Sequence, residues 1–143
     1  MMNEEVRSIM TKNPPTVAPE TTIEEASKIL LKTKVHHLPV VEGKILVGLV
    51  TTYDLWKLEK AHASTRDMKV KDVMSTNVIK IIPKDKVGTA AELFMDKRFH
   101  GLPVVNLRGE LKGVVTSLDV MRYMLKKEYP TPILYADEIE RDE

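Results

Sequence analysis

Apolar and polar positions change their period in the same order twice along the chain. Two short stretches rich in β-branched residues, "PTVAP" at 15–19 and "VIKIIP" at 78–83, predict strands that end at proline, because proline cannot donate to a sheet ladder. A helical pattern follows each stretch, and two more β-branched runs and a second helix come after it. The predicted order in each half is therefore β-α-β-β-α.

The first helix of each half is predicted from apolar residues spaced at i, i+3, i+4, i+7 and i+8. Thr22 together with Glu25 predicts a capping box at the start of the earlier helix, and Asp85 is the expected cap of the later one. The apolar positions are Ile23, Ala26, Leu30 and Leu31 in the first half, and Val87, Ala90, Ala91, Phe94 and Met95 in the second. Both stripes are expected to face a hydrophobic core.

The two halves are copies of one repeated unit. A shift of 64 residues places "VRSIMTKN" at 6–13 on "VKDVMSTN" at 70–77, and a shift of 65 places "GLVTTYD" at 48–54 on "GVVTSLD" at 113–119. Met10 and Met74 recur at equivalent places, which indicates shared packing. Self-similarity at a fixed spacing indicates that each copy forms one supersecondary unit.

The β-branched runs after each first helix predict two hairpins, whose short turns hold Gly43 and Gly109. A three-stranded sheet with helices on one face leaves its other face uncovered, so the two copies should pack sheet to sheet with the helices outside. We therefore expect an α/β (α+β) fold of two pseudo-symmetric units. The expected bounds are 6–60 for the first unit, 61–69 for a polar linker, 70–127 for the second unit and 128–143 for a C-terminal tail.

Composition narrows the class of protein. The 43% of hydrophobic and 30% of charged residues are typical of a globular chain, and 22 Lys and Arg against 21 Asp and Glu make nucleic-acid binding unlikely. The chain has no cysteine, which removes disulfides and thiolate sites. The apolar stretch "ILVGLV" at 45–50 is far shorter than the roughly 20 residues of a membrane span, and the amino terminus lacks an apolar signal core. We expect a cytoplasmic protein that does not associate with membranes.

The ordered segments "VRSIMTKNPPTVAPETTIEEA", "HHLPVV" and "GLVTTYDL", with their counterparts in the second copy, resemble the cystathionine beta-synthase (CBS) domain. Two such units in tandem resemble the pair called a Bateman module, and the resemblance spans residues 6–126. It implies a small stand-alone binding module and not an enzyme. The residues agree, because they supply neither a serine, histidine and acid nucleophile set nor a Walker-type glycine loop.

The resemblance also implies two clefts that bind an adenosine-containing regulatory ligand, namely AMP, ADP, ATP or S-adenosylmethionine, with no catalytic cofactor. By the family motif, Asp54 and Asp119 would hold ribose hydroxyls, and Thr51 and Thr116 would lie towards the phosphate or ribose. The motif glycine is expected to let the strand approach a flat base. The expected base pocket comprises Thr16, Val17, Lys80 and Ile81 of the first strands, with His36, His37, Leu38, Pro39, His100, Gly101, Leu102 and Pro103.

Each candidate site has a structural alternative. The Thr-x-x-Asp spacing also predicts a capping box, and the two roles do not exclude each other. The three histidines, with Lys34 or Arg98, either meet phosphate oxygens or face solvent at a helix end, and both interpretations stay open. A metal site is not expected, since adjacent histidines on an extended chain point to opposite sides. Tyr53 and Trp56 are expected to be packing residues.

Two functions of different classes follow from these patterns. The first is a ligand-sensing regulatory module that works as a homodimer of stacked CBS pairs or together with a regulated partner protein. The second is a non-catalytic dimerisation or interaction scaffold whose ligand sites are vestigial. Binding of an adenosyl ligand that is lost when Asp54 or Asp119 is changed to alanine separates the two.

Overall fold

The computed structural model describes residues 3–97 and 101–129. The first half contains a short 3-10 helix, a two-residue strand at 11–12 that the sequence did not predict, and the predicted helix, hairpin and second helix. The second half follows the same order without the initial strand. The elements of the first half are η1 (Val6–Ser8), β1 (Thr11–Lys12), α1 (Ile23–Thr33), β2 (His37–Glu42), β3 (Ile45–Thr51) and α2 (Thr52–Lys60). Those of the second half are η2 (Val70–Asp72), α3 (Val87–Lys97), β4 (Gly101–Val105), β5 (Leu111–Thr116) and α4 (Ser117–Glu128).

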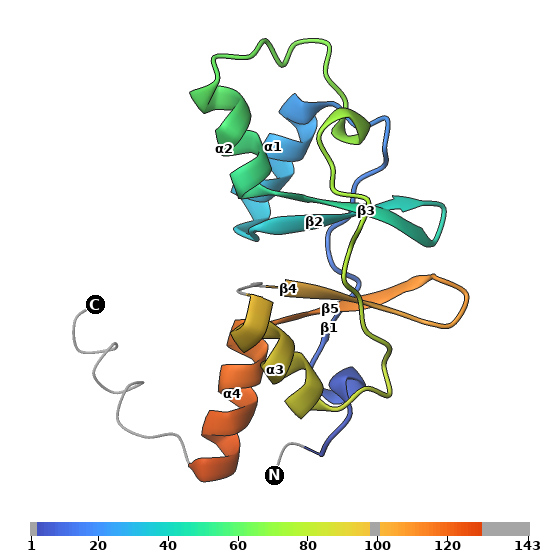
Figure 1. Ribbon diagram of the computed structural model, residues 1–143, viewed down its shortest axis with the longest axis vertical. Helices are drawn as coiled ribbons and strands as arrows, with labels where there is room; N and C mark the ends of the chain where they lie inside the picture. Colours follow the sequence, from blue (N-terminus) through green and yellow to red (C-terminus); the bar gives the residue numbers. More distant parts are fainter. Residues whose placement is uncertain (1–2, 98–100, 130–143) are drawn as a thin grey trace, which may run out of the picture.

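The two hairpins form the centre of the molecule, and the helices lie outside. Figure 1 shows β2 and β3 beside β4 and β5, with α1 and α2 at one end and α3 and α4 at the other. The hairpin tips are joined, because Leu46 N–H donates to the Gly109 carbonyl at 3.0 Å and Leu111 N–H donates to the Lys44 carbonyl at 2.9 Å. The predicted α/β fold of two units with helices outside is confirmed.

Both predicted hairpins are present, and their irregularities recur at equivalent places. The β2–β3 ladder shifts register between Val40 and Val41, and the β4–β5 ladder shifts between Val104 and Val105. Gly43 and Gly109 take φ angles of 61° and 81°, a left-handed conformation that glycine adopts without a steric penalty. The repeat in sequence is therefore a repeat in backbone geometry.

The predicted first strands are shorter than the sequence pattern indicates. Val17 and Ile81 each form only one parallel bridge, to Val40 and Val104 respectively. Val17 N–H donates to the Pro39 carbonyl at 3.1 Å, and its carbonyl accepts from Val41 N–H at 2.9 Å. The strands predicted at 15–19 and 78–83 were wrong, since each segment keeps only this one bridge. In the first segment, prolines on both sides of Val17 have no N–H with which to continue a ladder.

The leading segment of each copy packs on the other copy. Strand β1 pairs antiparallel with β5, with Thr11 opposite Val114 and Lys12 opposite Gly113. In the same way Ser75 pairs with Leu49 of β3. Each half therefore supplies a segment that pairs with the hairpin of the other half. We call residues 6–13 and 70–77 the exchanged segments.

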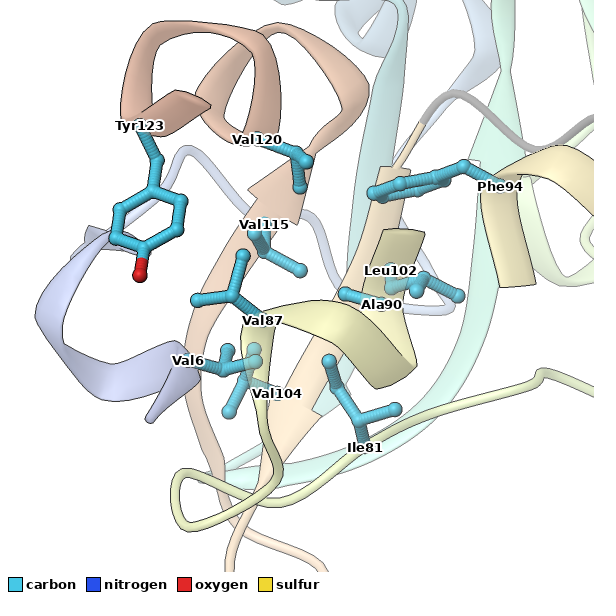
Figure 2. Close-up of a cluster of buried hydrophobic side chains, with 10 residues drawn as sticks. All are labelled: Val6, Ile81, Val87, Ala90, Phe94, Leu102, Val104, Val115, Val120 and Tyr123. Carbon is cyan, nitrogen blue, oxygen red and sulfur yellow. The ribbon is translucent and has the colours of Figure 1, made fainter. Parts of the chain in front are cut away.

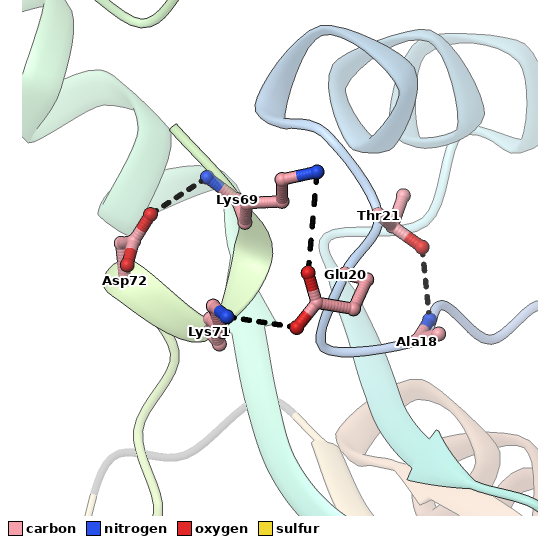
Figure 3. Close-up of polar contacts among 6 residues, drawn as sticks. All are labelled: Ala18, Glu20, Thr21, Lys69, Lys71 and Asp72. Atoms are coloured by element: carbon pink, nitrogen blue, oxygen red, sulfur yellow. Dashed lines mark hydrogen bonds and ion pairs between the residues drawn. The ribbon is translucent and has the colours of Figure 1, made fainter. Parts of the chain in front are cut away.

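Backbone hydrogen bonds repeat this exchange with the same shift of 64 residues. Val6 N–H donates to the Asp85 carbonyl at 2.7 Å, and Val70 N–H donates to the Thr21 carbonyl at 2.8 Å. Figure 3 shows that the second of these junctions also carries charged contacts, since Lys71 Nζ lies 2.8 Å and Lys69 Nζ 3.9 Å from carboxylate oxygens of Glu20. The hydrogen bond from Lys71 is the main cause that lowers the pKa of the Glu20 carboxyl below its ordinary value.

Each half has its own hydrophobic core, and each core includes one valine from the exchanged segment. Figure 2 shows the second core, with Val6 of η1 among residues of α3, β4, β5 and α4. Full burial of a side chain of this size contributes about 1.5–3 kcal/mol. The second core comprises Val6, Ile81, Val87, Ala90, Phe94, Leu102, Val104, Val115, Val120 and Tyr123, and the first comprises Val17, Ile23, Ala26, Leu30, Leu38, Val40, Val50 and Val70.

The helix stripes are narrower than predicted. Leu31 and Met95, the expected i+8 positions, are 83% and 82% exposed, so both predictions were wrong. Eight residues advance a helix by two turns plus about 80°, which carries the side chain off the face shared by i, i+3 and i+7. At the helix starts, Thr22 caps α1 by accepting from Glu25 N–H at 3.1 Å. The prediction that Asp85 caps α3 was wrong, because its side chain accepts from Ile82 N–H at 2.9 Å, in the turn that precedes the helix.

Met10 and Met74 have the shared packing that their repeat predicts. A Cβ atom on Gly113 would lie 2.9 Å from Met10 Sδ, and one on Gly48 would lie 2.7 Å from Met74 Sδ. Each motif glycine therefore admits the methionine of the exchanged segment. The expectation that these glycines serve a ligand base is corrected, because the space beside each backbone is filled by the protein itself.

Candidate functional site

The repeated Thr-x-x-Asp segments form two complete capping boxes. Thr51 Oγ1 accepts from Asp54 N–H at 3.2 Å, and Asp54 Oδ2 accepts from Thr51 N–H at 2.9 Å. Thr116 and Asp119 make the same pair of bonds at 3.1 and 2.8 Å. The capping interpretation is confirmed in both copies. The capping bond uses one oxygen of each carboxylate and leaves the other oxygen to accept further hydrogen bonds. The ribose-binding role of these two residues therefore stays a prediction.

A cleft of about 470 Å³ lies beside the second capping box, and its walls come from both halves. We call it the Asp119 cleft. Its volume falls within the range of small-molecule sites. The lining residues are Thr11, Pro14, Pro15, Lys34, Val35, His36 and His37 from the first half, and Val114, Thr116, Ser117, Leu118, Asp119 and Arg122 from the second.

Two chain reversals bring these residues together. Helix α1 ends where Lys34 takes a left-handed conformation, with φ 59° and ψ 22°, and its N–H donates to the Leu30 carbonyl at 2.9 Å. This turn directs residues 34–37 along the cleft. On the other side, β5 ends at Thr116 and the chain turns at once into α4. The amino-terminal turn of a helix concentrates N–H groups and positive partial charge, which favours an anion there.

The charged side chains of the cleft are two cations and one anion. Lys34 and Arg122 bring two cations, and Asp119 brings one carboxylate. His36 is exposed, and His37 is half-buried at the start of β2. The walls thus combine cations and hydroxyl groups with apolar surface from proline and valine.

Four of the predicted site residues line this cleft, namely His36, His37, Thr116 and Asp119. The side chains of Val17, Leu38, Ile81 and Leu102 lie in the two cores, and Pro39 and Pro103 are fully buried. A ligand would therefore meet these six residues only through backbone atoms. Thr16 and Lys80 are exposed and do not line the cleft. Ligand contact by any predicted residue stays a prediction.

The remaining predicted residues belong to the equivalent corner of the first copy. Thr51 and Asp54 stand there at the start of α2, and Asp54 Oδ1 lies 3.8 Å from Lys57 Nζ. By the repeat, the counterparts of Lys34 and His36 are residues 98 and 100. The predicted site residue His100 and its neighbour Arg98 lie outside the described residues.

Gly101 and His37 are equivalent in the repeat, and they meet between the two copies. A Cβ atom on Gly101 would overlap the imidazole ring of His37. The glycine of one copy therefore leaves the space that the histidine of the other copy fills. The regions beside the two capping boxes therefore differ, because only the first copy has a histidine at this position.

Sequence reasoning did not assign several cleft residues as ligand contacts, and two of them had a local signal. Arg122 follows Asp119 by three residues, which places both on one side of α4, and Ser117 directly follows the predicted cap Thr116. Thr11, Pro14 and Pro15 had none, because their position depends on the pairing of β1 with β5. Among residues 3–97 and 101–129, no group of three or more histidine or acidic side chains is placed to hold a metal ion.

Comparison with protein families agrees with this architecture. The family model described as the CBS domain matches residues 6–55 and again residues 70–126. The chain belongs to the CBS domain family and carries two of its units in tandem. Within the described parts of the chain, no helix combines the length and apolar character needed to cross a membrane.

Solved structures of CBS pairs superpose closely on the chain. CBSX2 in complex with AMP is 31% identical with a TM-score of 0.78, and the match covers 87% of this chain and 98% of that one. CBSX2 from Arabidopsis thaliana also matches, with a TM-score of 0.79 at 29% identity over 88% of this chain and 97% of that one. The CBS pair of protein MJ0100 in complex with 5'-methylthioadenosine and S-adenosyl-L-methionine is 32% identical, with a TM-score of 0.76 and coverages of 87% and 98%.

The curated relatives that match are longer proteins. Inosine-5'-monophosphate dehydrogenase of Korarchaeum cryptofilum is 35% identical over 105 residues, which are 73% of this chain and 21% of the enzyme. L-aspartate semialdehyde sulfurtransferase of Methanocaldococcus jannaschii is 34% identical over 119 residues, which are 82% of this chain and 22% of that protein. The chain thus spans about a fifth of the length of these relatives.

Proposed function

We propose that the chain is a non-catalytic regulatory module that binds an adenosine-containing ligand in the Asp119 cleft. The observation that carries the proposal is the composition of the cleft, which joins cations, a helix start and a carboxylate from both halves in one space of about 470 Å³. The AMP complex of CBSX2 and the 5'-methylthioadenosine and S-adenosyl-L-methionine complex of MJ0100, both more than 30% identical to the chain, support it.

Each group of the cleft has a role in this proposal. Asp119 accepts hydrogen bonds from ribose hydroxyls, chiefly through the oxygen that the capping box leaves over. Thr116, Ser117 and the first turn of α4 face the group attached to the ribose 5' carbon. Pro14, Pro15, Val35 and Val114 supply apolar surface for the flat faces of the base.

The placement of the cleft explains how binding would be sensed. Its walls include residues 34–37 from the first half and the start of α4 from the second, so a bound ligand contacts both units at once. A ligand that prefers one relative arrangement of the units shifts their equilibrium by its differential affinity. Coupling energies of this kind are about 1–3 kcal/mol, which is enough to alter the binding of a partner protein.

Isothermal titration of the chain with AMP, ADP, ATP, S-adenosylmethionine and 5'-methylthioadenosine tests the proposal. Asp119→Ala is expected to abolish binding in the Asp119 cleft. Asp54→Ala is the matched control, since it removes an equivalent capping box from α2 and leaves the Asp119 cleft intact. Binding that survives Asp119→Ala and is lost in Asp54→Ala would move the site to the other corner, and no binding of any of these ligands would refute the proposal.

A second function, assembly through the helices, is favoured by the exposed apolar side chains of α4. Leu118, Met121, Met124 and Leu125 are each at least 48% exposed, and Tyr53 and Trp56 of α2 are more than half exposed. The two aromatic rings stack on each other at a centroid distance of 5.9 Å, so the packing expected of them is this mutual contact at the surface. The apolar side chains of α4 line one groove, and contiguous apolar surface of this kind marks an interaction site.

We propose that a second copy of the chain covers this helical face in a homodimer. Light scattering coupled to size-exclusion chromatography is expected to give the mass of two chains for the wild type. The double variant Met121→Lys/Leu125→Lys is expected to give the mass of one chain. Lys126→Ala on the same helix is the control that keeps the dimer. A dimer that persists in the doubly charged variant would exclude this face.

A further inference from the structure

The Asp119 cleft carries an uneven set of charges. Lys34 and Arg122 bring two cationic side chains, and Asp119 carries the only carboxylate among the described lining residues. One oxygen of that carboxylate already accepts from Thr116 N–H at 2.8 Å. The start of α4 adds further positive partial charge. Cationic groups therefore outnumber carboxylates in the described lining of the cleft.

A sulfonium group has little to bind in such a site. Cationic ligands are held by carboxylates or by the faces of aromatic side chains. The described lining of the cleft contains no Phe, Tyr or Trp. A positively charged sulfur would stand near Lys34 and Arg122 with one partly engaged carboxylate to offset them.

We infer that the Asp119 cleft selects an adenosine 5'-phosphate over S-adenosylmethionine, with Lys34 and Arg122 as the residues that determine this selectivity. The inference rests on the proposed function and names the ligand class of the same site. Guanidinium and ammonium groups bind phosphate oxygens through charge-assisted hydrogen bonds, and α4 begins at the same place.

The backbone of Lys34 indicates which substitution can test this assignment. Lys34 ends α1 with φ 59°, a conformation that glycine usually provides at this position and that costs a residue with a side chain. Asn13 and His62 share this conformation without lining the cleft, so the backbone of Lys34 decides which substitution is tolerated and not which ligand binds. A glycine in its place would remove the charge and suit the backbone, so the variant Lys34→Gly is expected to stay folded.

Isothermal titration with four ligands separates the contributions. AMP and adenosine differ only by the phosphate, and S-adenosylmethionine and 5'-methylthioadenosine differ by the charged sulfonium and its amino-acid arm. AMP is expected to bind at least tenfold more tightly than adenosine, and S-adenosylmethionine no more tightly than 5'-methylthioadenosine. In Lys34→Gly and in Arg122→Ala the affinity for AMP is expected to fall about tenfold, while that for adenosine stays unchanged.

Lys32→Ala, on the exposed surface of α1 and outside the lining, is the matched control and is expected to keep the wild-type affinity for AMP. Equal affinities for AMP and adenosine, or tighter binding of S-adenosylmethionine than of AMP, would overturn the selectivity and leave the proposed function standing. Failure of all four ligands to bind would refute the proposed function, and the selectivity would fall with it.

Discussion

The exchanged packing of the leading segments predicts that Gly113→Ala destabilises the fold. A Cβ atom at residue 113 would lie 2.7 Å from the Thr11 carbonyl oxygen and 2.9 Å from Met10 Sδ. Real Cβ atoms do not approach other heavy atoms so closely, so β1 must move away from β5. Overpacking of this kind costs about 1–3 kcal/mol. The melting temperature should fall by about 4 °C for each kcal/mol in a chain of this size.

A double-mutant cycle identifies the cause of this loss. Met10→Ala removes the sulfur contact but leaves the Thr11 carbonyl in place, so it should restore only part of the stability of Gly113→Ala. In the other copy the nearest backbone atom to a Cβ at Gly48, the Ser75 carbonyl oxygen, is 3.0 Å away, so Met74→Ala should rescue Gly48→Ala more completely. Urea denaturation of the four single and two double variants measures both coupling energies.

One result would refute this reasoning. Replacing glycine by alanine restricts the unfolded chain, which by itself stabilises a protein by about 0.4–1 kcal/mol where the native backbone accepts a side chain. If Gly113→Ala is neutral or more stable than the wild type, β1 does not press on β5 and the exchange of segments is not as described.

Three further predictions concern single contacts. Gly101→Ala should lower the free energy of unfolding, because its Cβ overlaps the His37 imidazole, and His37→Ala should restore most of the loss in urea denaturation; equal losses with and without His37 would contradict this. Lys34→Gly should raise the free energy of unfolding by about 0.5–1 kcal/mol by relieving the left-handed backbone, as thermal denaturation measures, and a lower melting temperature would contradict it. The pKa of Glu20 is lowered from its ordinary value of 4.5 by the hydrogen bond from Lys71, so its stabilising contribution is present above that value and is lost as the pH falls through the lowered pKa. Glu20→Gln should therefore make the free energy of unfolding depend slightly less on pH in the acid range. If this dependence is unchanged in the variant, the exposed pair of Glu20 and Lys71 contributes nothing to stability.

Local features of the fold follow from the sequence because they depend on neighbouring residues. The capping boxes at Thr51 and Thr116 need only a hydroxyl and a carboxylate three residues apart. The hairpin turns need glycine at Gly43 and Gly109. The segment 15–19 forms only one bridge and no strand, because Pro15 and Pro19 have no N–H with which to extend the ladder that its β-branched residues favour.

The site could be predicted only in part. Asp119, Thr116, His36 and His37 were found because they belong to motifs that recur in the two copies. The cleft also uses Arg122 and residues 11–15, which no motif joins to them. A cleft between two units depends on which surfaces meet, and the hydrophobic period of each segment says only which face is buried.

The sequence by itself determined the two copies, the helix, hairpin and second helix of each, the caps at Thr22, Thr51 and Thr116, and the turns, since all of these depend on spacings within a few residues. Only the tertiary structure decided that η1 and β1 complete the second copy and that η2 completes the first. The sequence around Val6 and Val70 is compatible with either hydrophobic core, and the edge of β5 can form hydrogen bonds with any strand that reaches it. The choice depends on long-range packing of the whole chain, and this packing brings Thr11, Lys34 and Asp119 to one cleft.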